Sequence, residues 1–309
     1  MFKVFIDGQE GTTGLQLAER LHGRRDIELL WIQESLRKDE GERARLMNQA
    51  DLVFLCLPDE AAIQAGKLIT NERTRVIDAS TAHRVAPGWS YGFPELSPAH
   101  REAIASGTRI ANPGCYATGF LSIVYPLVSL GLISPDALLT CHAVSGYSGA
   151  GKKGIAQYER ADRSEAFKSP RLYGLGLAHK HLPEMRKVSG LEKPPVFNPM
   201  VCDFYAGMSV SVPLWAAQFA KRVTPASLKD SLSAFYEGSK LISVMDAPED
   251  GFLPANLLTG TNRLNLYAFG NGEQITLTAV LDNLGKGASG AAVQNMNIAL
   301  GLDEYAGLL

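Results

Sequence analysis

The sequence predicts an α/β protein with a doubly wound, Rossmann-like parallel sheet and a second, α+β domain built on a mixed or antiparallel sheet. Three observations lead to this prediction. Short apolar strands alternate with helical patterns through residues 3–112, a glycine-rich turn directly follows the first strand, and longer alternating strands occur between residues 137 and 281. The chain of 309 residues is also long for a single hydrophobic core, so we expect two domains.

The composition is that of an ordinary globular protein. Hydrophobic residues make up 46%, charged residues 20%, and the formal charge is −2, which gives no indication of a nucleic-acid or membrane partner. No apolar run approaches the roughly 18 residues of a spanning helix. Met1–Phe5 leads directly into a strand pattern, so we expect no signal peptide. The cysteines are scattered without zinc spacing, which predicts thiols, a cytoplasmic location and no metal; they are Cys56, Cys115, Cys141 and Cys202.

The first strand pattern, Lys3–Asp7, is followed by a glycine-rich turn and then by a helix pattern. Strand, turn and helix in this order form the first unit of a dinucleotide-binding fold, in which the pyrophosphate lies on the helix N-terminus. The spacing is G-x-x-G-x-x-G rather than the commoner G-x-G-x-x-G, and an ordinary turn is the alternative. The predicted cofactor-binding residues are Gly8, Gly11, Thr12, Thr13 and Gly14.

The residues after the second strand pattern, Ile27–Ile32, indicate which cofactor is bound. Ser35, Arg37 and Lys38 follow it. An acid at this place suits the free 2′-hydroxyl of the adenosine ribose, whereas Arg or Lys with a hydroxyl suits a 2′-phosphate. We therefore expect NADP(H), although Glu34 is nearby. The alternative is that the basic residues belong to a solvated charged face.

Two further strand patterns, Ala50–Leu57 and Arg75–Asp78, continue the alternation. The first is almost entirely apolar, as expected of a parallel strand covered on both faces. Pro58 follows it at a helix start, and Ser80 follows the second. Because ligands bind at the carboxyl ends of strands in open sheets, Pro58 and Ser80 are further candidate cofactor-binding residues.

Cys115 is the candidate nucleophile. Thr108–Ala111 reads as a strand, residues 112–114 as a tight turn, and Cys115 onward as an apolar helix that Pro126 should kink or end. In the first turn of a helix, the backbone N–H groups and the helix dipole favour a thiolate and can hold an oxyanion. The alternative is a small buried hydrophobic residue.

The part of the chain after the Cys115 helix has a different pattern of predicted elements. Ser145–Lys153 reads as a flexible basic loop, and His179 and His181 precede a probable helix start. The other elements we expect are strands at Ala137–Val144, Val210–Trp215 and Gln274–Leu281, and a helix at Leu228–Tyr236.

The last stretch, Asp282–Asn297, begins as a glycine-rich loop and becomes a helix of small residues. We expect it to return to the first domain and close the cofactor cleft; a tightly packed structural helix is the alternative. The predicted dinucleotide-binding domain is residues 1–112, completed by residues 288–309. Residues 113–287 are the predicted catalytic and oligomerisation domain.

Five separated motifs carry a resemblance to a known family. They are Tyr-Gly-Phe-Pro-Glu-Leu at 91–96, Asn-Pro-Gly-Cys-Tyr-Ala-Thr at 112–118, Ser-Gly-Tyr-Ser-Gly-Ala-Gly at 145–151, His-Lys-His-Leu-Pro-Glu at 179–184, and Gly-Lys-Gly-Ala-Ser-Gly at 285–290. With these motifs, the chain resembles the N-acetyl-gamma-glutamyl-phosphate reductase family, in the shorter of its two forms.

The resemblance implies NADPH-dependent reduction of N-acetyl-L-glutamyl 5-phosphate to N-acetyl-L-glutamate 5-semialdehyde and phosphate, in arginine biosynthesis, by a homodimer or homotetramer. Cys115 would form a thioester after phosphate leaves, and a protonated histidine would support release of the aldehyde. His179 and His181 are both candidates for that histidine.

Further candidates lie in the loops. Gly149 and Asn283 are candidate cofactor-binding residues. Arg84 and Lys152 are candidates for holding the phosphate or the substrate carboxylate, because of their charge and loop position, with a surface role as the alternative. Glu184 belongs to the same substrate group and could orient a histidine.

Other functions are compatible with parts of the pattern. Aspartate-semialdehyde dehydrogenase shares the architecture and the thioester chemistry, and a related route could use a carrier-bound substrate. A dinucleotide-sensing regulatory subunit would not need Cys115 and two histidines. A cysteine hydrolase without a cofactor would leave the glycine loop unexplained.

Overall fold

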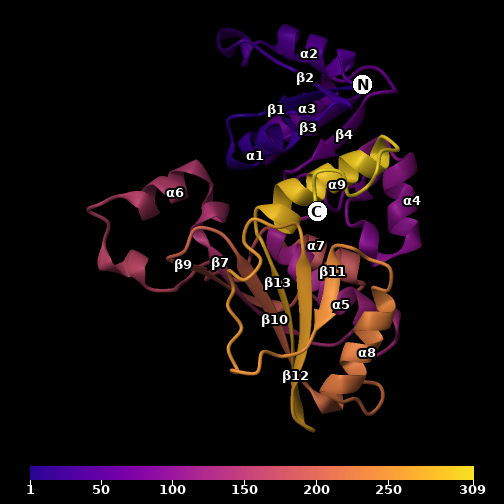
Figure 1. The fold of residues 1–309 in the computed structure, drawn as a ribbon, viewed down its shortest axis with the longest axis vertical. Helices are drawn as coiled ribbons and strands as arrows, with labels where there is room; N and C mark the ends of the chain where they lie inside the picture. Colours follow the sequence, from indigo (N-terminus) through magenta and orange to yellow (C-terminus); the bar gives the residue numbers. More distant parts are fainter. The chain divides into compact units, whose positions relative to one another are not determined.

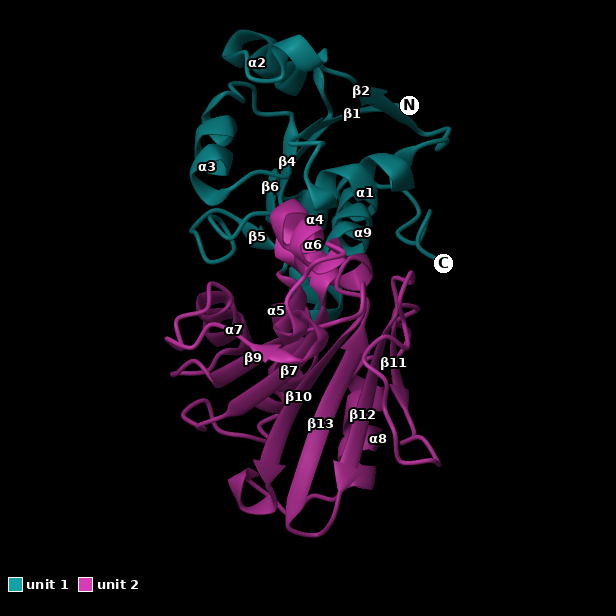
Figure 2. Ribbon diagram, turned by 90° about the vertical axis from the view of Figure 1, so that its left-hand side faces the viewer, with its two compact units in different colours: residues 1–113, 288–309 teal, residues 114–287 magenta.

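A computed structural model describes residues 1–309, which form two compact units (Figure 2). Unit 1 consists of Met1–Pro113 and Ala288–Leu309, and unit 2 of Gly114–Gly287. None of the helices combines the length and the apolar character needed to cross a membrane.

Unit 1 is built on a six-stranded sheet in the order β2-β1-β3-β4-β6-β5, and every neighbouring pair is parallel. The predicted doubly wound parallel sheet is therefore confirmed. Its elements in chain order are β1 (Phe2–Asp7), α1 (Thr12–Leu21), β2 (Ile27–Leu30), α2 (Glu40–Gln49), β3 (Leu52–Leu55), α3 (Asp59–Lys67), β4 (Arg75–Asp78), β5 (Ser90–Tyr91), α4 (Pro98–Ser106), β6 (Arg109–Ala111) and α9 (Gly290–Ala299).

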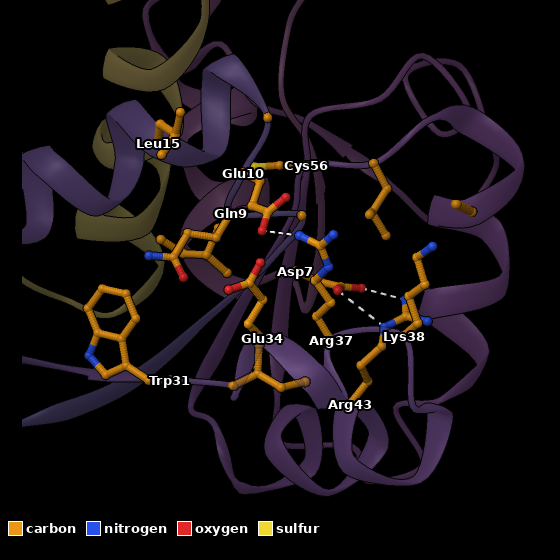
Figure 3. A pocket seen from close by; sticks show the side chains of 16 residues that line it. Asp7, Gln9, Glu10, Leu15, Trp31, Glu34, Arg37, Lys38, Arg43 and Cys56 are labelled. Atoms are coloured by element: carbon orange, nitrogen blue, oxygen red, sulfur yellow. Dashed lines mark hydrogen bonds and ion pairs between the residues drawn. The ribbon is translucent and has the colours of Figure 1, made fainter. Parts of the chain in front are cut away.

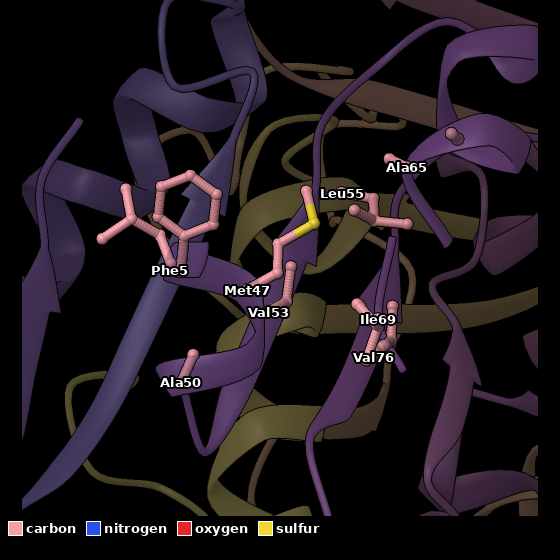
Figure 4. Close-up of a cluster of buried hydrophobic side chains, with 10 residues drawn as sticks. Phe5, Met47, Ala50, Val53, Leu55, Ala65, Ile69 and Val76 are labelled. Atoms are coloured by element: carbon pink, nitrogen blue, oxygen red, sulfur yellow. The ribbon is translucent and has the colours of Figure 1, made fainter. Parts of the chain in front are cut away.

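A hydrophobic cluster between the strands and the helices α2 and α3 stabilises this sheet (Figure 4). Phe5 of β1 lies in register with Val53 of β3, and both side chains are buried. Met47 of α2 and Ala62 of α3 pack into the same cluster and are completely buried. All four residues of β3 are buried, which explains the nearly continuous apolar run that predicted this strand.

The last helix, α9, contacts α1, α4 and β4 within unit 1, and it is yellow in Figure 1. All its residues are buried. Small residues such as Ala291 and Ala292 allow this close packing. Asn297 accepts a hydrogen bond from Arg24 at 2.8 Å and donates to the Glu304 carbonyl at 3.0 Å, so its buried amide is satisfied.

Unit 2 is built on a seven-stranded mixed sheet in the order β11-β12-β13-β10-β7-β9-β8. The β7–β9 and β11–β12 pairs are parallel and the others antiparallel, which confirms the predicted α+β class. Helices α5 and α8 pack on the sheet, and Figure 2 shows α8 behind β12. The elements are α5 (Cys115–Ser129), β7 (Thr140–Gly146), α6 (Gly151–Glu159), β8 (Arg171–Leu172), α7 (Leu182–Ser189), β9 (Val196–Cys202), β10 (Met208–Trp215), α8 (Pro225–Phe235), β11 (Ile242–Met245), β12 (Leu264–Gly270) and β13 (Gln274–Leu281).

Pro126 does not end helix α5, which continues to Ser129, so of the two effects expected of this proline only a kink is left. Proline removes the N–H that would bond to the carbonyl four residues earlier, and the buried Tyr236 hydroxyl donates to that Ser122 carbonyl instead, at 2.8 Å. The predicted flexible loop after β7 is in fact a 3₁₀ turn, Tyr147–Ala150, followed by α6.

Candidate functional site

In the glycine-rich turn after β1, two glycines allow a close approach of backbone to backbone that other residues would prevent. Gly8 has a φ of +85°, and a Cβ there would lie 2.4 Å from the Cys56 carbonyl oxygen. A Cβ on Gly14 would lie 2.5 Å from the Gly8 carbonyl oxygen. The turn is therefore packed against β3 and the start of α1 so closely that side chains are excluded at both positions.

The N-terminus of α1 has the features of an anion-binding site. Its N-cap residue, Gly11, offers no side chain to bond the first N–H groups of the helix. Thr12 is the first helical residue, and its Oγ1 is buried without a hydrogen-bond partner. Thr13 follows it and is half-buried. These residues fit the pyrophosphate of a dinucleotide, because it would satisfy both the helix N–H groups and the Thr12 hydroxyl.

A cavity of about 730 Å³ lies beside this turn (Figure 3). Arg37 and Lys38 line it, whereas Ser35 is exposed and does not. Arg37 forms an ion pair with Glu10 of the glycine turn. Glu34 also lines the cavity, so both acids and bases surround it.

Arg43 is a cavity residue that the sequence analysis did not select. Its Nη2 lies 2.6 Å from Asp7 Oδ2, and its Nε donates to Asp7 Oδ1 at 3.2 Å. Figure 3 shows this paired arrangement at the carboxyl end of β1. Its position in the first turns of α2 gave no sequence signal, because the surrounding residues are also charged.

The candidate cofactor-binding residues at the carboxyl ends of β3 and β4 lie outside this cavity. Pro58 is the N-cap of α3. Ser80 is buried, and its hydroxyl donates to Asp78 Oδ2 at 2.6 Å. Nδ1 of His83 also lies 2.6 Å from that oxygen, and its ring stacks on Trp89 with centroids 4.0 Å apart. Neither Pro58 nor Ser80 lines the 730 Å³ cavity.

Arg84, a predicted substrate residue, supports the backbone of unit 1. Its Nε donates to the Asn112 carbonyl at 3.0 Å, and its Nη2 donates to the Ala79 carbonyl at 3.1 Å. The guanidinium therefore joins the loops that follow β4 and β6.

In unit 2, Cys115 is the first residue of α5, as the sequence predicted. Its N-cap, Gly114, makes no side-chain bond to the helix, so no N-cap side chain competes with a ligand for the N–H groups of the first turn. A Cβ on Gly287 would lie 2.8 Å from the Cys115 Cβ, so this glycine allows the backbone to approach the cysteine. Burial raises the pKa of the other three thiols, those of Cys56, Cys141 and Cys202.

His179 and His181 lie together, with ring centroids 4.8 Å apart and planes nearly perpendicular. The His181 backbone N–H donates to His179 Nδ1 at 3.1 Å, so neutral His179 carries its proton on Nε2. His181 is buried, and its Nε2 lies 4.0 Å from Glu184 Oε1. The Gly114 N–H donates to Glu184 Oε2 at 3.2 Å, so one buried carboxylate adjoins both the cysteine turn and a histidine.

Two tyrosines complete this cluster, and the sequence analysis gave neither a role. The rings of both histidines lie against Tyr116, at centroid distances of 5.7 and 5.9 Å. The Tyr173 hydroxyl donates to the Tyr116 hydroxyl at 3.0 Å. Burial raises the pKa of both phenols, so they are protonated donors near pH 7. Tyr116 could have been suspected because it directly follows Cys115; Tyr173 carries no such signal.

Cys115 and His179 line one cavity of about 260 Å³. Tyr173, Gly149 and Arg171 line it as well, but His181 and Lys152 do not. Lys152 is exposed in the first turn of α6. The cavity therefore joins the candidate nucleophile and one histidine with a cation, Arg171, that the sequence analysis did not select.

Asn283, a predicted cofactor-binding residue, holds the backbone of unit 2. Its Oδ1 accepts from the Gly207 N–H at 2.8 Å, and its Nδ2 donates to Ser148 Oγ at 2.9 Å. A Cβ on Gly149 would lie 3.3 Å from that Nδ2, so the two residues are close neighbours. No group of three or more His, Cys, Asp or Glu side chains is arranged to hold a metal ion.

Comparisons with known proteins identify the family to which the chain is similar. Residues 3–105 match the family model described as "Semialdehyde dehydrogenase, NAD binding domain", and residues 115–283 match "Semialdehyde dehydrogenase, dimerisation domain". The chain is 46% identical to N-acetyl-gamma-glutamyl-phosphate reductase 2 of Nostoc sp., over 99% of each chain. It is 47% identical to the reductase 2 of Pseudomonas putida, over 96% of each chain.

The fold is similar to those of solved aspartate semialdehyde dehydrogenases. The type II enzyme of Vibrio cholerae, complexed with ASA, gives a TM-score of 0.73 at 16% identity, over 97% of this chain and 98% of that one. The Francisella tularensis enzyme gives 0.72 at 15% identity, over 96% and 99%. At these identities the likeness concerns the fold alone.

Proposed function

The chain belongs to the N-acetyl-gamma-glutamyl-phosphate reductase family, and we propose that it catalyses the NADPH-dependent conversion of N-acetyl-L-glutamyl 5-phosphate to N-acetyl-L-glutamate 5-semialdehyde and phosphate. This is a step of arginine biosynthesis. The observation that carries the proposal is Cys115, at the start of a helix, in one cavity with His179.

The Cys115 thiolate attacks the acyl carbon, forming a C–S bond, and the C–O bond to phosphate breaks with the electron pair leaving on phosphate. The first-turn N–H groups of α5 stabilise both the thiolate and the oxyanion. A nicotinamide cofactor bound to unit 1 would supply the hydride by which the thioester is reduced. The C–S bond then breaks, and the thiolate is restored as the aldehyde leaves.

His179 is the histidine that we assign to this chemistry. It lines the cavity with Cys115, and the bond to its Nδ1 leaves the proton on Nε2, which can donate to a substrate oxygen. His181 is buried beside Glu184, outside the residues that line the cavity, and we assign it a positioning role. Arg84 and Lys152 stay candidates for holding the phosphate or the substrate carboxylate.

Unit 1 is the proposed cofactor-binding part, with residues 288–309 completing it, and unit 2 is the proposed catalytic part. The glycine turn and Thr12 fit the pyrophosphate, and Arg37 and Lys38 supply the positive charge that a 2′-phosphate requires. These two cations favour NADP(H) over NAD.

Self-association and a cytoplasmic location are part of the proposal. The match to a dimerisation domain supports a dimer or tetramer. The absence of a disulfide among the four cysteines fits a reducing compartment.

The test is turnover in the reverse direction, with phosphate and NADP as co-substrates. N-acetylglutamate semialdehyde and aspartate semialdehyde are compared side by side, and we expect kcat/KM to favour the acetylated substrate by about 10³-fold or more. A preference for aspartate semialdehyde would reject the proposal in favour of the related dehydrogenase. Hydrolysis of the acyl phosphate without NADPH consumption would favour a cysteine hydrolase.

A further inference from the structure

Arg171 is a cation with an unusual setting at the edge of the Cys115 cavity. It lies on β8, which pairs with β9, and its side chain lines the cavity together with Cys115 and His179. Its Cζ lies 3.8 Å from the ring centroid of Phe167 and 4.9 Å from that of Tyr158. Its Nε donates to the Tyr158 hydroxyl at 3.2 Å. Two aromatic rings and one hydrogen bond therefore fix the plane of the guanidinium.

The acidic residues nearby are used by other cations. Arg160 pairs with Asp162 at 2.7 Å, Arg163 pairs with Asp203 at 2.7 Å, and Lys168 pairs with Glu165 at 2.7 Å. Arg171 forms no ion pair, and only its Nε is used in a hydrogen bond within the protein. The donors on Nη1 and Nη2 are left for a ligand. Arg171 is half-buried, held in orientation, without an acidic partner, and in one cavity with the proposed nucleophile. Such a cation is suited to an anionic part of the substrate.

We propose that Arg171 binds the carboxylate of the acyl substrate and so selects substrates that carry an anionic group away from the reacting carbonyl. The inference rests on the proposed function, since N-acetylglutamyl phosphate has one such carboxylate. The planar fork of a guanidinium matches a carboxylate with two parallel hydrogen bonds. The aromatic rings reduce the entropy lost on binding, because they hold the fork in place beforehand. Lys180 also lines the cavity but is exposed and has no comparable support.

The experiment compares two aldehydes in the reverse reaction: N-acetylglutamate semialdehyde, and the same compound with its carboxylate replaced by a carboxamide. In the unmodified enzyme we expect kcat/KM to favour the carboxylate by about 10- to 100-fold. Arg171→Gln should bring this ratio close to one, by loss on the carboxylate substrate alone. Turnover of the carboxamide in the same variant shows that the variant is folded. Arg171→Lys should keep part of the preference, because it keeps the charge but not the fork.

Arg160→Gln is the matched control, because it removes an exposed arginine charge at the end of α6 without touching the cavity. It should leave the ratio unchanged. An unchanged ratio in Arg171→Gln would overturn the inference. A raised KM for phosphate together with an unchanged ratio would overturn it too, and would assign Arg171 to the phosphate instead. If the unmodified enzyme turns over neither aldehyde, the proposed function fails before Arg171 is tested.

Discussion

The cavity beside the glycine turn of unit 1 and the Cys115 cavity of unit 2 are assembled in different ways. The cavity in unit 1 is made mainly by neighbouring segments of the chain: β1, the glycine turn, and the residues after β2. The cavity in unit 2 brings together Cys115, residues 145–158 and residues 171–180, which the mixed sheet places side by side. The first depends on backbone shape within one turn, and the second on tertiary packing of distant side chains. Substitutions should therefore affect the two units in separable ways.

The largest expected effect is that of Cys115→Ser. We expect kcat to fall by about 10⁴-fold or more, because the weaker nucleophile cannot form the thioester. NADPH binding, measured by fluorescence titration, should change by no more than a few-fold if the cofactor is held by unit 1. Cys202→Ala, at a buried thiol outside both cavities, is the control and should keep its activity. Substantial reduction by the serine variant would remove Cys115 from its role.

His179→Ala comes next, with an expected loss of about 10²- to 10³-fold in kcat. The same change at His181 should be milder in kcat, because its ring does not line the cavity. Steady-state rates of both variants over a range of pH check this, since only loss of the acid should flatten one limb of the profile. Equal, mild losses in the two variants would reject both histidines as the acid–base residue.

Gly8→Ala tests the backbone shape of unit 1. The new Cβ would be forced against the Cys56 carbonyl, so we expect NADPH affinity to fall at least about tenfold and the free energy of unfolding to fall by about 2–4 kcal/mol. Gly23→Ala is a matched control, because Gly23 has a similar φ of +79° but no atom within 4 Å of a Cβ. It should cost about 1 kcal/mol of stability and leave cofactor binding intact. Similar NADPH affinities in the two variants would contradict the role of close packing.

The smallest effects concern the charges around the unit 1 cavity. Replacing Arg37 and Lys38 by Ala should weaken NADPH binding about tenfold and NADH binding little, because only NADPH carries the 2′-phosphate. Glu10→Gln should strengthen NADPH binding a few-fold, because it releases Arg37 from its ion pair. Dissociation constants of NADPH and NADH measure both effects. An unchanged preference for NADPH in the variant without Arg37 and Lys38 would refute the 2′-phosphate assignment.

The same difference between local structure and tertiary packing determines how much of the structure could be predicted from the sequence. The parallel sheet, the glycine turn and the helix start at Cys115 were predicted because each depends on local patterns: apolar strands, turn residues and helical periodicity. The role of each site residue, by contrast, remains a prediction.

Helix α6 could not be predicted, because Gly151 and Gly154 within it argue against a helix. Its stability comes from tertiary packing: the buried Tyr158 stacks on Tyr147 with centroids 4.7 Å apart. The packing of Arg171 against the rings of Phe167 and Tyr158 could not be predicted either, because it too depends on tertiary structure. The hydrogen bonds of the Asn283 amide to Gly207 and Ser148 could not be predicted either, because they join residues that are far apart in the sequence.

The central claim is that Cys115 carries the acyl group, and a single-turnover measurement without phosphate tests it most directly. Enzyme mixed with N-acetylglutamate semialdehyde and NADP should release a burst of about one NADPH per active site and then stop, because the thioester has no acceptor. Mass spectrometry of the quenched enzyme should place the acetylglutamyl group on Cys115. A fully active enzyme with no burst, or with the acyl group on another residue, would contradict the account.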